Sequence, residues 1–196
     1  SGLKFEKIIK VINKIKPVNG RLQQVGTIKN KSKVILDYAH TPEALKACLQ
    51  SLKEQFTDKK ISIVFGCGGN RDKSKRLTMG KIVNQYCDKI YLTDDNPRNE
   101  NPKKIRSMIK KQINKSSFFE VPDRSKAIQK AILDLNIGDI LIVAGKGHEN
   151  IQDYGKIKKL FSDKKEILNS IKKKNKNLSE NIKLNIINEI SKTNNI

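Results

Sequence analysis

The segment KVILDYAHTPEALKACLQSLKEQFTDKKISIVFG, residues 33–66, determines the fold class of this chain. It opens with an apolar run that predicts a strand ending at Tyr38 or Ala39. Residues 41–56 have the apolar spacing of an amphipathic helix, and residues 60–66 contain a second short apolar run. A strand, a helix and a strand in this order predict a βαβ unit whose two strands run parallel.

The helix of this unit carries its own start signals. Thr41 can cap the first turn, and Pro42 suits the first helical position. The side chains that we expect it to bury are Leu45, Cys48, Leu49 and Leu52.

The same alternation continues as far as Gly145, which closes the last strand. Further helices are predicted over 77–87, 101–113 and 124–135, and further strands over 88–94, 117–123 and 139–145. Asn101, which precedes a proline, is suited to start the helix at that position. We therefore predict an α/β domain with a Rossmann-like, mostly parallel sheet and flanking helices.

Both ends of the chain depart from this pattern. Residues 3–16 have nearly helical apolar spacing, which Pro17 and Gly20 terminate. After Leu168 the chain is rich in Lys and Asn; one amphipathic helix capped by Ser179 could form there, and the rest would be a solvated tail. We predict three parts: a linker helix or the end of a preceding domain at 1–16, the α/β domain at 17–168, and a helical or disordered tail at 169–196. We interpret the Ser-Gly start, without Met, as a cut from a longer protein or a tag remnant.

The composition favours a small-molecule site over nucleic acid. The chain has 196 residues and a formal net charge of +21, but the lysines are scattered over every segment. It has no Trp and no alternation of basic and aromatic residues that would stack bases, so we expect no specific nucleic-acid partner and only non-specific attraction at low salt. No apolar run is long enough to span a bilayer and no signal peptide is visible, so we expect no membrane partner.

The cysteines indicate a reducing compartment. Cys48, Cys67 and Cys87 are odd in number and lack C-x-x-C spacing, which argues against a disulfide framework and a zinc site. We expect buried thiols in a cytoplasmic protein, and a monomer.

Four polar clusters follow predicted strands: DYAHTP, GCGGNR, DDNPR and GKGHE. Parallel sheets bind ligands at the carboxyl ends of their strands, so we expect these clusters to form one site. GCGGNRDK lacks the third glycine of a dinucleotide loop because Arg71 stands there, and the chain contains no P-loop motif. Its glycines still permit tight turns with exposed N–H groups, and Arg71 could pair with a carboxylate or remain a solvated side chain of a glycine turn.

The DDNPR cluster suits a small zwitterion. Pro97 fixes its own φ angle and restricts Asn96, so that Asn96 and Arg98 sit on a rigid turn. A cation there fits a carboxylate, and an acid such as Asp95 or Glu149 fits an ammonium group. The histidines of the other clusters, at positions 40 and 148, could face a nucleotide or be structural. No hydrolase triad, paired-acid motif or metal-ligand cluster stands out, so we predict no catalytic residue and no metal ligand.

Together these clusters resemble the C-terminal domain of the Mur ligases. The resemblance is strongest to the subgroup that adds the third residue of the peptidoglycan stem peptide, the UDP-N-acetylmuramoyl-tripeptide synthetases. The matching stretches cover about residues 17–168 and are NGRLQ, DYAHTPEAL, VFGCGGNRDKSKR, TDDNPRNE, DRSKAI, VAGKGHE and FSDKKE. Two departures are Asn70, where many relatives have an acid, and the tail after residue 168.

The resemblance implies a role for each cluster. The DNPR motif selects meso-diaminopimelate over L-lysine, with Arg98 on the distal carboxylate and Glu149 on the distal ammonium group. The implied amino-acid site comprises Arg71, Asp95, Asn96, Pro97, Arg98, Gly145 and Glu149. Arg21, Asp37 and His40 would face ATP.

The resemblance also implies the reaction of a longer enzyme. An absent central domain would hold most of the ATP together with Mg²⁺, and a further domain would hold UDP-MurNAc-L-Ala-D-Glu. ATP would phosphorylate the D-glutamate carboxylate, and the amine of diaminopimelate would then attack the acyl phosphate. Without a P-loop, this chain alone should not catalyse ligation.

Three alternatives remain at this point. An L-lysine-adding ligase or a folylpolyglutamate synthetase would share the fold, although Arg98 argues against both. A stand-alone amino-acid-binding module would carry the same pocket without ligating. A basic nucleic-acid-binding protein would instead show steeply salt-dependent binding to DNA.

Overall fold

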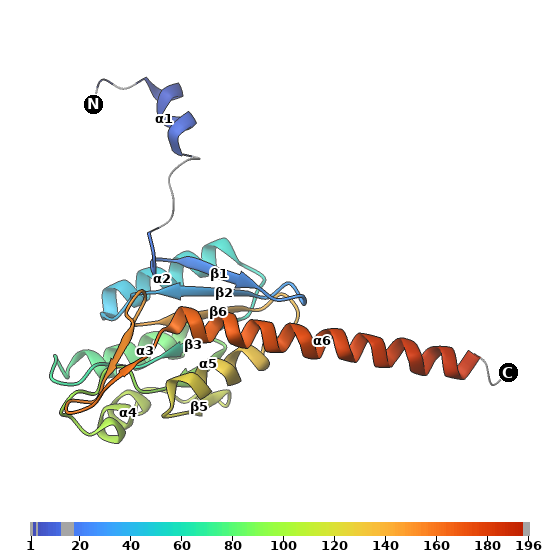
Figure 1. Cartoon of the computed structure of the whole chain (residues 1–196). Helices are drawn as coiled ribbons and strands as arrows, with labels where there is room; N and C mark the ends of the chain where they lie inside the picture. Colours follow the sequence, from blue (N-terminus) through green and yellow to red (C-terminus); the bar gives the residue numbers. More distant parts are fainter. Residues whose placement is uncertain (1, 3, 13–17, 194–196) are drawn as a thin grey trace.

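The computed structural model describes residues 2, 4–12 and 18–193 (Figure 1). Its strands are β1 (Gln23–Thr27), β2 (Lys33–Asp37), β3 (Ile61–Phe65), β4 (Lys89–Leu92), β5 (Phe118–Glu120), β6 (Ile140–Ala144), β7 (Ile151–Asp153) and β8 (Lys158–Leu160). Its helices are α1 (Phe5–Ile12), α2 (Pro42–Gln55), α3 (Lys75–Tyr86), α4 (Pro102–Lys110), α5 (Arg124–Leu133) and α6 (Asp163–Thr193). The predicted end of the first helix at Pro17 lies outside the described residues.

Six strands form one sheet in the order β1-β2-β6-β3-β4-β5. β1 runs antiparallel to β2, and every other neighbouring pair is parallel. β6 lies at the centre, where Ile142 pairs with both Ile35 and Ile63. The predicted mostly parallel α/β fold is therefore confirmed.

The sheet is buried on both faces, which explains why its central strands are continuously apolar. Alternate residues of β3 and β6 point to opposite layers: Ile63 and Ile142 pack with α2, α3 and α4, whereas Val64 and Val143 pack with α5 and the start of α6. Figure 1 shows these two helical layers on either side of the sheet. The core therefore holds β6 rigidly, and the carboxyl end of β6 carries part of the site.

The helix starts follow the predicted chemistry. The side chain of Thr41 accepts a hydrogen bond from the backbone N–H of Ala44, and Asn101 accepts one from Lys104. The predicted stripe of α2 is buried at all its positions, namely Leu45, Cys48, Leu49 and Leu52. The three cysteines are buried and free, and burial raises the pKa of the Cys48 and Cys67 thiols to about 12.

Three elements were not predicted: the edge strand β1 and the two strands of the β7–β8 hairpin. β1 is only partly buried, and its register is interrupted between Gln24 and Gly26. The strands of the hairpin have three residues each and bury a single side chain, Gln152. Such short, polar strands carry almost no period-two apolar signal.

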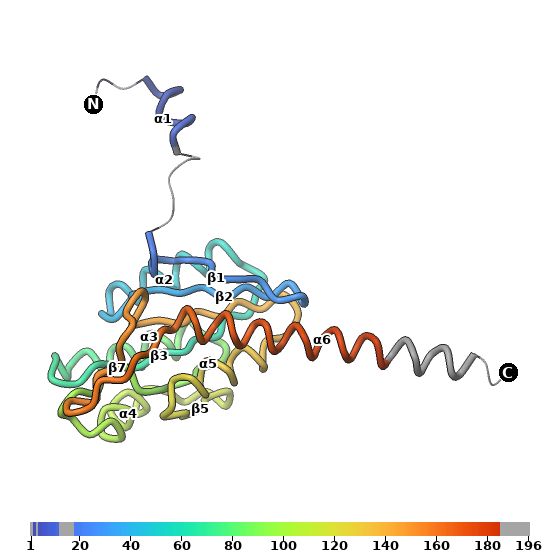
Figure 2. The backbone as a smooth tube through the Cα atoms, in the orientation of Figure 1, coloured from blue at the N-terminus to red at the C-terminus, as the bar shows by residue number. Residues whose placement is uncertain are grey.

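The end of the chain has the helical form that was one of the two predicted for the tail, but the helix begins earlier than Ser179. α6 is one continuous helix that starts at Asp163 and passes Leu168 without a break (Figure 2). Ser179 is therefore not a helix cap: its hydroxyl donates to the carbonyl of Asn175, one turn earlier. The domain limits at 17 and 168 stay a prediction.

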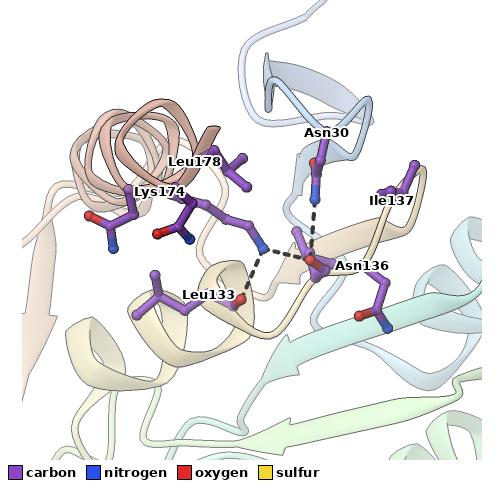
Figure 3. Close-up of a pocket in the computed structure, with 9 residues that line it drawn as sticks. Asn30, Leu133, Asn136, Ile137, Lys174 and Leu178 are labelled. Atoms are coloured by element: carbon purple, nitrogen blue, oxygen red, sulfur yellow. Dashed lines mark hydrogen bonds between the residues drawn. The ribbon is translucent and has the colours of Figure 1, made fainter. Parts of the chain in front are cut away.

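Lys174 fastens α6 to the end of α5. Its side chain is buried, and its Nζ donates to the carbonyls of Ile132, Leu133 and Leu135 at 2.9, 2.9 and 2.5 Å. The carbonyl of Ile132 also accepts from backbone N–H groups and that of Leu135 from the Asn30 side chain, and the ammonium group adds a charged donor where the helical pattern of α5 ends. Figure 3 shows this contact beside a shallow cavity that Asn30 and Ile137 also line.

The start of α6 is fixed by a buried ion pair. Arg124 donates from Nε and Nη2 to the two carboxylate oxygens of Asp163, both at 2.7 Å, and neither side chain is exposed. The same guanidinium donates to the carbonyl of Ala144, the last residue of β6. This pair joins α5, α6 and the central strand just below the carboxyl end of the sheet.

We expect Asp163→Asn to destabilise the fold by about 3–5 kcal/mol, because it leaves the buried Arg124 charge uncompensated. The double variant Arg124→Met/Asp163→Leu should recover part of that loss, since no charge then remains buried. Urea unfolding followed by circular dichroism measures both. A single variant as stable as wild type would contradict this role for the pair.

Candidate functional site

A cavity of about 140 Å³ opens at the carboxyl ends of the parallel strands. It brings together most of the predicted site residues. It is lined by Tyr38, His40, Gly68, Arg71, Lys75, Asp95, Asn96, Arg98, Gly145 and Glu149. The cavity therefore draws on all four clusters. Pro97, Arg21 and Asp37 are not among its lining residues.

The DDNPR loop has a backbone that its own side chains stabilise. Asp95 accepts a hydrogen bond from the N–H of Asn96 at 2.7 Å, and the carbonyl of Asn96 accepts one from Gly69 at 2.9 Å. A Cβ atom on Gly69 would lie 1.9 Å from the carbonyl oxygen of Pro97, so only glycine permits this approach. Arg98 has a φ of +51°, a left-handed conformation that bulky residues rarely adopt.

Arg98 is half-buried and keeps part of its guanidinium free. Its Nη1 donates to the carbonyls of Gly69 at 2.8 Å and Asn96 at 3.4 Å. Within the described part of the chain, neither Arg98 nor the exposed Arg71 forms an ion pair. Two guanidinium groups at one cavity without a carboxylate partner suit an anionic ligand.

Asn96, Lys146 and Glu149 form a closed hydrogen-bonded triangle. Lys146 Nζ donates to Asn96 Oδ1 and to Glu149 Oε2, both at 2.9 Å, and Asn96 Nδ2 donates to the same Glu149 oxygen at 2.9 Å. Burial disfavours the charged form of Glu149, but the hydrogen bonds from Lys146 and Asn96 outweigh it and hold its pKa below the ordinary value. Glu149 is thus a carboxylate at neutral pH.

Asp95 is the second acid at the cavity. Among the described residues, its buried Oδ2 has no hydrogen-bond partner, and it lies 4.0 Å from Nη1 of Arg124, for which none is found either. Gly145, with a φ of +113°, passes so close that a Cβ atom there would lie 2.8 Å from Oδ2. The Arg124 charge offsets part of the cost of burying this oxygen, and Asp95 adds negative charge to the wall of the cavity.

Of the residues predicted to face a nucleotide, His40 lines the cavity and Arg21 lies against Tyr38, another lining residue. Arg21 places its guanidinium 4.7 Å from the ring of Tyr38, which also contacts the rings of His40 at 4.6 Å and His148 at 5.5 Å. Exposed rings and a stacked guanidinium suit a flat ligand.

Asp37, by contrast, is buried and is occupied by the backbone. Its two oxygens accept from the N–H groups of Leu22 and Ala39, both at 2.7 Å. It fixes the segment that carries Arg21 and the start of the DYAH loop. Its position therefore indicates a positioning role toward any ligand bound at the rings.

The β7–β8 hairpin clamps the DDNPR loop from outside. Asp153 donates its N–H to Asn96 Oδ1 and accepts from the N–H of Arg98, both at 2.9 Å. The buried Gln152 side chain donates to the carbonyls of Asp94 at 3.2 Å and Asp95 at 2.9 Å. The left-handed conformation of Arg98 is thus held by backbone contacts that its own sequence motif does not contain.

Sequence reasoning missed five contributors to the site: Lys146, Arg124, Gln152, Lys75, and Tyr38 as a ring platform. A lysine between two glycines directly after a buried strand was a signal for the first. Arg124 begins the stretch DRSKAI, but its partner Asp163 is distant in the sequence. No local pattern identifies Gln152.

We expect Gln152→Ala to loosen the DDNPR loop, because two buried carbonyls lose their donor at a cost of about 1–3 kcal/mol. Amide hydrogen exchange of residues 94–98 should accelerate, whereas exchange in α2 should change little. The exposed substitution Gln129→Ala on α5 serves as the control. Unchanged protection of the loop would refute the clamp.

We expect Glu149 to add to stability at neutral pH. Its pKa is lowered in the folded state, so its contribution is complete above the unfolded value near 4.5 and is lost as the pH falls through the lower folded value. Wild type should therefore lose more stability than Glu149→Gln when the pH falls below about 4.5. Urea midpoints at several pH values test this, and parallel losses in both proteins would contradict it.

Comparison with known proteins supplies the family context. The sequence profile described as "Mur ligase, glutamate ligase domain" matches residues 20–147. The chain is 45% identical over 163 residues to UDP-N-acetylmuramoyl-L-alanyl-D-glutamate--2,6-diaminopimelate ligase of Rickettsia felis, a match that covers 83% of this chain and 30% of that protein. For the protein of the same name from Rickettsia bellii, the identity is 46% over 160 residues, with 81% and 33% covered.

A solved structure of a ligase with that name superposes with a TM-score of 0.73 at 34% identity, covering 87% of this chain and 35% of that one. The chain thus spans about a third of the length of the relatives that it matches. Among the described helices, none is both long enough and apolar enough to cross a membrane. Because the family profile covers the sheet from β1 to β6 and the loops at its carboxyl end, the chain belongs to the Mur ligase family.

Proposed function

We propose that this chain is the amino-acid-binding, C-terminal domain of a cytoplasmic, monomeric, ATP-dependent ligase. The ligase would join meso-diaminopimelate to UDP-MurNAc-L-Ala-D-Glu in peptidoglycan synthesis. The observation that carries the proposal is the cavity, which holds the acidic residues Asp95 and Glu149 together with Arg71 and Arg98, two arginines that have no carboxylate partner within the described residues. The names of the relatives agree with this substrate.

The charges of the cavity match those of the amino acid. Meso-diaminopimelate carries an amino group and a carboxylate at each end. Arg98, supported by Arg71, would bind the distal carboxylate, and Glu149 with Asp95 would bind the distal ammonium group. Asn96, Pro97 and Gly145 would shape the walls. L-Lysine lacks the distal carboxylate, so its binding would leave Arg98 unpaired.

The role of the chain in the reaction would be to position the nucleophile. ATP would convert the D-glutamate carboxylate to an acyl phosphate; the free amine of the bound diaminopimelate would attack the carbonyl carbon, and phosphate would leave. Clamping the distal end orients the reacting amine and lowers the entropic cost of the attack. We assign no proton-transfer residue to this chain.

The nucleotide would lie against the rings at the cavity mouth. Arg21 and His40 could contact its base or ribose, with Tyr38 as a platform and Asp37 holding both segments in place. Mg²⁺ would neutralise phosphate charge, but within the described residues no three His, Cys, Asp or Glu side chains gather, so we assign no magnesium ligand here. The phosphates would be held by parts of the enzyme outside this chain.

We expect the chain to bind meso-diaminopimelate in preference to L-lysine and to the LL-isomer, and Arg98→Ala to remove that preference. The loss of about 1–3 kcal/mol corresponds to a roughly 5- to 150-fold weaker affinity for meso-diaminopimelate. Isothermal titration calorimetry measures it. Lys103→Ala, an exposed cation on α4, is the matched control and should bind as wild type does.

Equal affinity for L-lysine would contradict the assignment of Arg98 and favour the lysine-adding alternative. Binding of no amino acid would contradict a site that is complete within this chain. Selective binding by this chain without ligation is the result that we expect.

A further inference from the structure

The amino-acid site contains a buried cation with no assigned role. The Lys146 side chain is 0% exposed. All three protons of its ammonium group have an acceptor: Asn96 Oδ1 at 2.9 Å, Glu149 Oε2 at 2.9 Å and the carbonyl of Ile151 at 2.6 Å. Lys146 therefore has no donor left for a ligand.

Lys146 determines which way the amide of Asn96 points. Asn96 Oδ1 accepts from two donors that cannot accept, Lys146 Nζ and the backbone N–H of Asp153. The Nδ2 group must then face the opposite way, where it donates to Glu149. Without the ammonium group, the bond from Asp153 and the bond to Glu149 would remain, and Glu149 would have lost its own charged partner.

Lys146 also divides the two oxygens of Glu149 between protein and ligand. Oε2 accepts from both Lys146 and Asn96. Oε1 accepts no hydrogen bond within the described chain, and Glu149 lines the cavity. A carboxylate held in this way stays ionised and rigid while the cavity is empty, with one oxygen available.

Burying an ammonium group carries a desolvation cost of several kcal/mol, which its ionic and hydrogen-bonding contacts must offset. A methionine of similar length would fill the same space but would leave three acceptors without this donor. Two of these acceptors belong to residues that line the cavity, Asn96 and Glu149. What methionine cannot do is orient Asn96 and keep Glu149 charged.

Resting on the function proposed above, we infer that Lys146 is a positioning residue of the amino-acid site. Its ammonium group fixes the side chains of Asn96 and Glu149, so that Glu149 Oε1 receives the ammonium group of the ligand. The lysine touches no ligand atom. It pre-organises the acidic side of the cavity, and its loss weakens binding through Asn96 and Glu149.

The wild-type chain supplies the first measurement. In ¹⁵N-detected NMR spectra, the Lys146 ammonium protons should be protected from exchange with water, and the Asn96 side-chain amide should give one sharp pair of signals. Saturation with meso-diaminopimelate should leave the ammonium signals protected, because the ligand uses the other oxygen of Glu149. Rapid exchange of these protons with water would overturn the inference without any variant.

The second measurement compares Lys146→Met with Lys174→Met. Both lysines are buried and donate to three acceptors, but Lys174 lies on α6 against the end of α5 (Figure 3) and does not line the site cavity. Lys146→Met should weaken meso-diaminopimelate binding about 10-fold or more, shift the Asn96 amide signals and raise the pH at which the Glu149 carboxyl titrates. Binding should then fall toward acidic pH, where wild-type binding is still flat.

Lys174→Met should lower the stability of the chain and leave all three site readouts as in wild type. If Lys146→Met also leaves them unchanged, the inference is wrong. If Lys146→Met fails to fold, the wild-type ammonium signals test the inference: protection from exchange supports it, and rapid exchange with water contradicts it. If wild type binds no meso-diaminopimelate, the proposed function fails on this chain, and the Asn96 and Glu149 signals of Lys146→Met still decide whether Lys146 positions these side chains.

Discussion

The parallel pairing of β6 with β2 and β3 is the constraint on which the site depends. Asp37 pairs with Ala144 at the end of one ladder, and Phe65 pairs with Leu92 at the end of another, so four strands finish at the same edge. The DYAH, GCGGNR, DDNPR and GKGHE segments leave the sheet together there. Because the sheet is buried on both faces, this edge cannot shift without disturbing the core. The parallel direction of the strands therefore determines where the cavity forms, and the side chains determine only what it can bind.

Buried cations then fix the loops and helices whose positions the sheet does not determine. Most of the positive charge of this chain lies in solvent, but Arg76, Arg124, Lys146 and Lys174 are almost fully buried. Each joins segments that lie apart in the sequence: Arg76 joins the GCGGNR loop to Glu100, and Arg124 joins β6 and α5 to α6. Apolar packing has little direction, whereas a cation with several acceptors defines angles as well as distances. These buried charges carry a desolvation cost, and they lie at positions where the orientation of neighbouring segments must be defined.

The sequence predicted those features that local chemistry determines. Periodicity identified the central strands and helices, caps such as Thr41 marked the helix starts, and the ends of parallel strands indicated where polar clusters would meet. It did not predict β7 and β8, because short strands that bury one glutamine have no apolar period. It missed the ion pair of Arg124 with Asp163 and the triangle around Lys146, because their partners meet only after folding. The sequence favours Ser179 as a cap because the stretch that forms α6 contains no glycine or proline to mark a boundary, and the structure shows that the helix begins at Asp163.

Selectivity for a zwitterion is, on this structure, a property of the backbone as much as of the arginine. Arg98 faces the cavity from a left-handed residue, and the carbonyl of Asp153, on a hairpin outside the motif, holds that conformation. Lys146 occupies one oxygen of Glu149 and leaves the other for the ammonium group of the proposed ligand. The two charges proposed to bind the ligand are thus each fixed by a neighbour, and Asn96 accepts a bond from both Lys146 and Asp153. The cation-binding and anion-binding halves of the cavity are consequently coupled through Asn96.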